Sequence, residues 1–80
     1  MVSRSQHLVL PKGTTTLIRN LISDRTGMFF DNGKSDLLID KLAPLVIDRG
    51  FSSYLDYYYL LKYDATALNE WQNVVNALSV

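Results

Sequence analysis

Two glycines that each precede a large apolar residue, Gly27–Met28 and Gly50–Phe51, constrain this chain more than any other feature. Glycine adopts the left-handed conformation that ends a helix without a steric cost, and the apolar residue after it can fold back onto the last turn. Apolar residues recur at helical spacing before and after both pairs. The sequence therefore predicts short helices that end at these glycines.

The apolar pattern predicts four helices in a small all-α domain. Three of them follow a residue whose side chain can accept a hydrogen bond from the free N–H groups of the first turn. The expected ranges are about 15–26, 35–49, 53–63 and 65–78. The expected capping residues are Thr14, Thr15 or Thr16 for the first helix, Ser52 or Ser53 for the third and Asp64 for the fourth.

Pro44 lies inside the second predicted helix. An interior proline removes the hydrogen bond to the carbonyl of the residue four positions earlier, here Asp40, and costs about 3 kcal/mol. Two outcomes are expected. The helix is either kinked near residues 40–43 or split into two pieces, with Pro44 beginning the second.

The third predicted helix is apolar on most of its circumference. One stripe has helical spacing at Tyr54, Tyr57, Tyr58 and Leu61, and further apolar residues cover much of the other side. A helix with apolar residues on most faces is usually buried on more than one of them. In so small a domain this predicts an additional partner surface, and we assign Tyr59, Leu60 and Tyr63 to an interface with another domain.

Eighty residues hold at most one small domain. Residues 1–13 lack periodicity and close with the breakers Pro11 and Gly13, so we expect a flexible N-terminal arm followed by a helical domain over 14–80. The last helical pattern carries no stop signal before Val80. The chain is therefore expected to be a fragment of a larger protein.

Composition excludes several classes of function. The 8 basic and 8 acidic side chains cancel, whereas a nucleic-acid binder usually carries a clear excess of Lys and Arg. There is no cysteine for a disulfide or a thiolate metal site. No signal sequence and no apolar stretch of about 20 residues is present, so we expect a cytoplasmic protein that does not insert into a membrane.

Candidate chemistry is sparse. His7 is the only histidine, and the carboxylates are scattered over predicted loops and helix exteriors, where capping and helix-dipole roles suffice. The glycines are isolated at element ends and form no phosphate-binding loop. The sequence predicts no catalytic residue, no metal and no cofactor in this chain.

Several short motifs follow one another along the chain. They are the apolar helix of residues 17–24 ending in Arg25-Thr26-Gly27, then Lys34, Leu38, Lys41-Leu42, Gly50-Phe51-Ser52-Ser53-Tyr54, Tyr57 and Asn76-Ala77-Leu78-Ser79. In their order and spacing, over about residues 15–80, they resemble the N-terminal all-α domain of CheR-type chemotaxis receptor methyltransferases. The family is made of bacterial enzymes of signal transduction.

This resemblance implies a substrate-docking domain. Its parent enzyme would be an S-adenosylmethionine-dependent protein-glutamate O-methyltransferase, whose catalytic domain would follow residue 80. The resemblance implies two partners: that catalytic domain and the cytoplasmic helices of methyl-accepting chemoreceptors. The residues expected to bind the receptor are Lys34, Lys41 and Arg49.

The chain departs from the family pattern where basic residues are common in the second helix, at Pro44, Leu45 and Ile47. A divergent receptor or another signalling partner therefore stays an alternative. A second hypothesis is a stand-alone helical interaction module, such as a signalling adaptor that associates with itself through its tyrosines. A small DNA-binding domain is the least favoured, because the net charge is zero.

Overall fold

A computed structural model describes residues 8–64 and 67–79 of the chain. Within them it contains four α-helices and one short 3-10 helix, and no strand. Their bounds are α1 Thr14–Thr26, η2 Asn32–Lys34, α2 Ser35–Asp48, α3 Tyr54–Tyr63 and α4 Leu68–Leu78. The predicted all-α class with four helices is confirmed.

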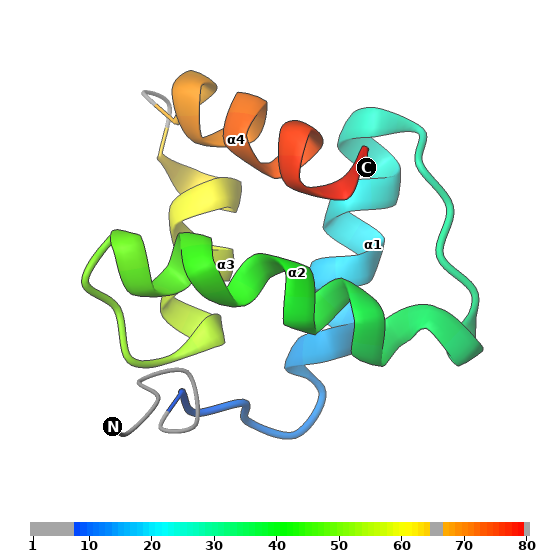
Figure 1. Cartoon of the computed structure of the whole chain (residues 1–80), viewed down its shortest axis with the longest axis horizontal. Helices are drawn as coiled ribbons and strands as arrows, with labels where there is room; N and C mark the ends of the chain where they lie inside the picture. Colours follow the sequence, from blue (N-terminus) through cyan, green and yellow to red (C-terminus); the bar gives the residue numbers. More distant parts are fainter. Residues whose placement is uncertain (1–7, 65–66, 80) are drawn as a thin grey trace.

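The helices pack as two pairs, and the helices of one pair run across those of the other. α1 packs against α3 and α2 against α4, and α1 also contacts α2. In Figure 1, α2 and α4 run across the view while α1 and α3 run up and down on its two sides. The end of α1 lies next to α4, with Thr26 and Val75 lining one surface groove.

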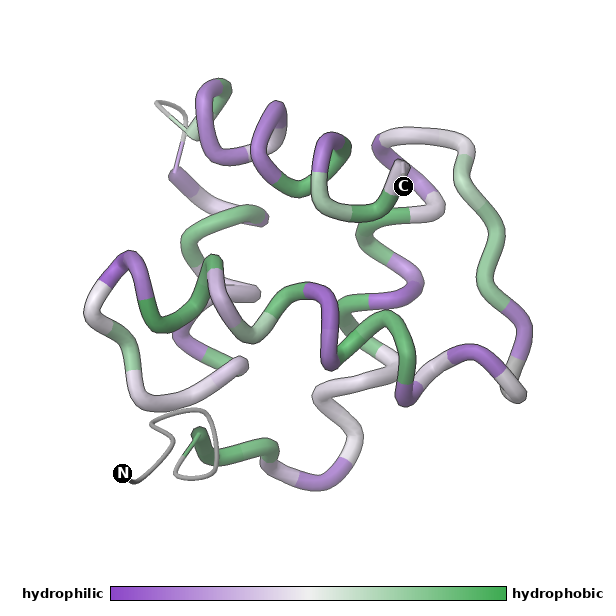
Figure 2. Tube along the Cα trace, in the orientation of Figure 1, coloured by the Kyte–Doolittle hydropathy of each residue, from purple (hydrophilic) through white to green (hydrophobic). Residues whose placement is uncertain are grey.

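The core lies between the four helices. Figure 2 shows hydrophobic and hydrophilic residues alternating along each helix, so each helix has one apolar side. The predicted tyrosine stripe is confirmed, because Tyr54, Tyr57, Tyr58 and Leu61 are all buried. The other members of the core cluster are Ile18, Ile22, Leu38, Ile39, Leu42, Ala43, Val46, Val74 and Leu78.

Both predicted glycine C-caps are confirmed. Gly27 has φ 77° and donates its N–H to the Ser23 carbonyl at 2.9 Å, the single-bond left-handed cap. After α2, Gly50 donates to Ile47 at 2.9 Å and Phe51 to Val46 at 3.2 Å, the paired bonds of a Schellman motif. Met28 and Phe51 both pack against the core, as expected.

The predicted N-caps were correct only for α3, where the Ser53 hydroxyl accepts the Leu55 N–H at 3.2 Å. The threonine cap of α1 was wrong. Gly13, with φ 87°, occupies the cap position, and Thr14 is a buried first residue of the helix. Asp64 does not cap α4, which begins only at Leu68. It ends α3 instead, and its backbone carbonyl accepts the Ala67 N–H at 3.1 Å. The predicted start of this helix, at 65–66, lies outside the described residues.

Pro44 lies within α2, which continues as one helix to Asp48. The predicted alternative of two separate pieces was therefore wrong. Pro44 and Asp40 are both exposed, so water can satisfy the Asp40 carbonyl that loses its hydrogen bond. The neighbouring Ala43 and Val46 remain in the core, and their burial holds the helix together across the proline.

Residues 8–10, near the end of the expected arm, contact the start of α3. The Val9 N–H donates to the Ser52 carbonyl at 2.8 Å, the Val9 carbonyl accepts the Tyr54 N–H at 3.0 Å, and Leu8 packs against the core. The sequence could not indicate this bridge, because it joins segments far apart in the chain. The rest of the expected arm, residues 1–7, lies outside the described part.

Candidate functional site

A groove forms where the loop after α1 passes the start of α2 and the end of α4. It has a volume of about 200 Å³. We call it the lysine groove, and its lining residues are Phe29, Phe30, Lys34, Leu37, Leu38, Lys41 and Leu78. Phe29 is 93% exposed and Leu37 is 53% exposed, so large apolar side chains face solvent beside the two lysines.

Local structure explains why two of the predicted receptor-binding residues meet. η2 ends at Lys34, which is also the N-cap residue of α2. Lys41 is seven residues further on, and two helical turns return it to nearly the same face. The arrangement presents two cations and an apolar floor on one side of the domain.

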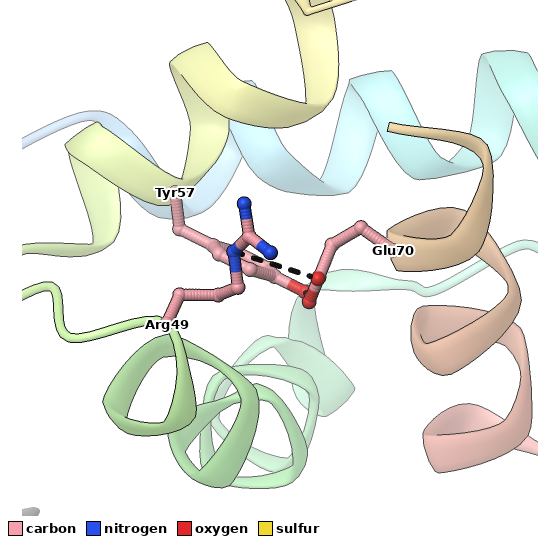
Figure 3. A network of polar contacts seen from close by, with 3 residues as sticks. All are labelled: Arg49, Tyr57 and Glu70. Atoms are coloured by element: carbon pink, nitrogen blue, oxygen red, sulfur yellow. Dashed lines mark hydrogen bonds and ion pairs between the residues drawn. The ribbon is translucent and has the colours of Figure 1, made fainter. Parts of the chain in front are cut away.

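Arg49 does not join this groove. It follows the last residue of α2, about 20 Å along the helix axis from its first turn. There its Nε lies 3.7 Å from the Glu70 Oε1, and the Tyr57 hydroxyl donates to the Glu70 Oε2 at 2.5 Å. Figure 3 shows Arg49, Tyr57 and Glu70 converging from the end of α2, from α3 and from α4. We call these three residues the carboxylate junction.

The junction is largely shielded from water. Tyr57 is fully buried and Glu70 is 6% exposed, whereas the Arg49 side chain is about half exposed. Burial raises the pKa of Tyr57 far above its usual value, and its hydrogen bond to Glu70 and the charge of that carboxylate raise it further. The nearby Arg49 opposes this shift. Tyr57 therefore acts as a hydrogen-bond donor that holds α4 on α3.

Sequence reasoning missed the role of Glu70, which it placed with the other carboxylates on helix exteriors. Its signal was its spacing, because Glu70, Val74 and Leu78 are four residues apart and form the inward row of α4. Leu68, the first residue of this helix, lies outside that row and is 78% exposed. Leu17 of α1 and Leu37 of α2 are also exposed, at 42% and 53%.

The predicted domain-interface residues lie on the outer side of α3. Tyr59 is 48% exposed and Tyr63 is 69% exposed, while Leu60 is partly buried against the core. The rings of Tyr59 and Tyr63 lie 5.9 Å apart. Lys62 donates a hydrogen bond to the Tyr58 hydroxyl at 3.2 Å, and this contact is the first cause of a raised Lys62 pKa.

No group of three or more His, Cys, Asp or Glu side chains that could hold a metal ion occurs among residues 8–64 and 67–79. In the same described segments, no helix is long and apolar enough to cross a membrane. His7 lies outside them.

The family model of the CheR methyltransferase all-alpha domain matches residues 15–79, which include all four helices but for Thr14. No curated protein and no solved structure matches the chain.

Proposed function

Because the chain belongs to the CheR methyltransferase all-alpha domain family, we propose that it docks chemoreceptors for a protein-glutamate O-methyltransferase. The partner is a cytoplasmic helix of a methyl-accepting receptor, and the lysine groove is the docking surface. The observation that carries the proposal is the convergence of Lys34 and Lys41 on a groove with exposed Phe29 and Leu37.

The groove suits an amphipathic helix with acidic residues beside its apolar stripe. Apolar side chains of such a helix would cover Phe29 and Leu37, and its carboxylates would meet the two lysines. The lysines supply orientation and a faster encounter, whereas the apolar contacts supply most of the affinity. Arg49 takes no direct part in this proposal, because it contacts Glu70 at the other end of α2.

The methyl transfer itself belongs to a separate catalytic domain of the parent enzyme. S-adenosylmethionine bound there would supply the methyl group, and the product would be a carboxyl methyl ester of glutamate. We assign no catalytic step to this chain. Its part in the reaction is to hold the receptor helix near that domain, in the cytoplasm.

We also propose that Tyr59, Leu60 and Tyr63 pack against the catalytic domain. Tyrosine suits such an interface, because it buries a large ring while its hydroxyl keeps a hydrogen bond. Hydroxyl-radical footprinting of the full-length natural protein should show Tyr59 and Tyr63 protected relative to the 80-residue chain. Equal labelling of both tyrosines in the two proteins would contradict this assignment.

The experiment that tests the docking function is methyl transfer by the full-length protein, with labelled S-adenosylmethionine and receptor-bearing membranes. We expect base-labile label on the receptor and a salt-sensitive KM. The double variant Lys34→Glu/Lys41→Glu should raise KM about tenfold and leave S-adenosylmethionine binding unchanged. Lys12→Glu, an exposed lysine outside the groove, is the matched control.

An unchanged KM in the double variant would refute the lysine groove as the docking surface. If the full-length protein shows neither methyl transfer nor S-adenosylmethionine binding, the enzyme reading fails. The alternative function, a helical signalling adaptor, would then take its place.

A further inference from the structure

We propose that the outer face of α4 pairs with the same face of a second copy of this chain. The face consists of Leu68, Trp71, Gln72, Val75 and the exposed amides of Asn69, Asn73 and Asn76. It is separate from the lysine groove, and the proposal does not depend on receptor docking.

The first observation is an apolar groove along α4. It is formed with the end of α1, has a volume of about 450 Å³, and is lined by Arg25, Thr26, Met28, Leu68, Trp71, Gln72 and Val75. Leu68 stands at one end with 78% of its surface exposed. A two-fold contact needs a surface that is complementary to itself. Here the exposed leucine of one copy can insert into the apolar groove of the other.

The walls of this groove are held in place before any partner arrives. The Trp71 Nε1 donates to the Leu61 carbonyl at 3.1 Å, which fixes the indole. The Arg25 guanidinium lies 5.5 Å from the centre of the same ring, in a cation–π arrangement. A preformed groove lowers the entropy cost of association.

The lack of exposed charge on α4 indicates which partner binds this face. Each of α1, α2 and α3 exposes charged side chains, for example Asp24, Asp40 and Lys62. Among the helices in the described part of the chain, only α4 exposes none, since its single charged residue, Glu70, is buried. In a two-fold contact the face meets its own copy, and like charges near the axis would repel, so a helix that exposes no charge favours a second copy over a charged partner. Arg25, the charged residue in the groove lining, comes from α1 and is held against the Trp71 ring.

The polar residues of the face support the same partner. Amide side chains both donate and accept hydrogen bonds, so an amide can pair with an identical amide. Gln72 already donates to the Asn76 Oδ1 along the helix at 3.2 Å. Two α4 helices running antiparallel, with Gln72 near the axis, would bring Leu68 of one copy to Val75 of the other.

The contact is expected to be weak and insensitive to salt. α4 has 11 residues and is about 16 Å long, so the buried area falls below that of a standard stable interface. Sedimentation equilibrium of the 80-residue chain, up to about 1 mM, should show a mass rising toward twice that of the monomer. A monomer over the whole concentration range would overturn the proposal.

Substitutions in the face make the test specific. Leu68→Glu should raise the dimer dissociation constant at least tenfold, whereas Leu17→Glu, at an exposed leucine of α1, should leave it unchanged. Gln72→Glu and Gln72→Lys should each weaken association alone, and an equimolar mixture should restore it. Circular dichroism confirms that each variant is folded. An unaltered dissociation constant in Leu68→Glu, or no recovery in the mixture, would refute the two-fold contact.

Discussion

The two ends of α2 carry similar basic side chains that the fold treats differently. At its start, Lys34 lines an open groove beside exposed apolar residues. At its end, Arg49 lies 3.7 Å from a buried carboxylate that also binds Tyr57. The difference shows that the role of a basic side chain depends on the residues around it more than on its position along the helix. A cation beside a buried carboxylate stabilises the fold, whereas one at an open groove can bind a partner. The carboxylate junction should therefore govern stability, and the lysine groove should govern docking.

The largest effect is expected at the centre of the junction. Glu70→Ala leaves the buried Tyr57 hydroxyl without its acceptor and opens a small cavity, so it should lower the free energy of unfolding by about 2–4 kcal/mol. Urea denaturation followed by circular dichroism measures this loss. Glu70→Gln keeps an acceptor oxygen and serves as the matched control with a smaller loss. Equal losses in both variants would show that charge, and not the hydrogen bond, is what matters.

Alkaline pH should lower the stability of the fold through two buried tyrosines, Tyr57 of the junction and Tyr54. Free tyrosine has a pKa of about 10, and burial raises the pKa of both Tyr57 and Tyr54 in the folded chain. Above about pH 10 the unfolded chain loses these protons while the folded chain keeps them, so stability falls by up to about 1.4 kcal/mol per pH unit for each tyrosine.

Urea denaturation between about pH 8 and 11 checks the slope. In the Tyr57→Phe variant the free energy of unfolding should fall less steeply with pH, because only Tyr54 still contributes to the slope. A pH dependence identical to that of the natural chain would contradict the assigned cause.

Arg49→Gln should have a smaller effect, a loss of no more than about 1 kcal/mol. The side chain is about half exposed, so water screens its attraction to Glu70, and Tyr57 still satisfies the carboxylate. The measurement is urea denaturation at neutral pH. A loss as large as that in Glu70→Ala would mean that the ion pair, and not the tyrosine, holds α4.

The smallest effect on stability is expected at the other end of α2. Lys34→Gln removes an exposed cation, so the free energy of unfolding should change by less than about 0.5 kcal/mol. Receptor methylation by the full-length protein should nevertheless show a raised KM and a weaker dependence on salt. A loss of stability in this variant, or an unchanged KM for receptor methylation, would contradict the assignment of stability to one end of α2 and docking to the other.

Much of the fold follows from local sequence patterns. The tyrosine stripe of α3 and the two glycine caps were predicted correctly, because helical spacing and a left-handed glycine act within a few residues. The missed features depend on tertiary contacts. The spacing of Glu70 with Val74 and Leu78 indicates an inward position, but its acceptor role depends on Tyr57, thirteen residues away.

The candidate site was predicted in part for the same reason. Lys34 and Lys41 meet because a helix brings positions seven apart to one face. Phe29 lies outside the predicted helices, and its place beside the groove depends on how the loop after α1 passes α2 and α4. Arg49 lies at the end of the same helix as Lys41, but its role depends on Glu70 of α4, which the fold places beside it.

The bridge between Val9 and the start of α3 has a consequence for the order of folding. Its two hydrogen bonds close a loop that contains all of α1 and α2. The chain loses the conformational entropy of closing this loop before the two hydrogen bonds can form. We therefore expect this contact to form late, after α1 and α2 have packed. The amides of Val9 and Tyr54 should accordingly exchange with solvent through local opening, while the amides of the core helices wait for the whole domain to unfold.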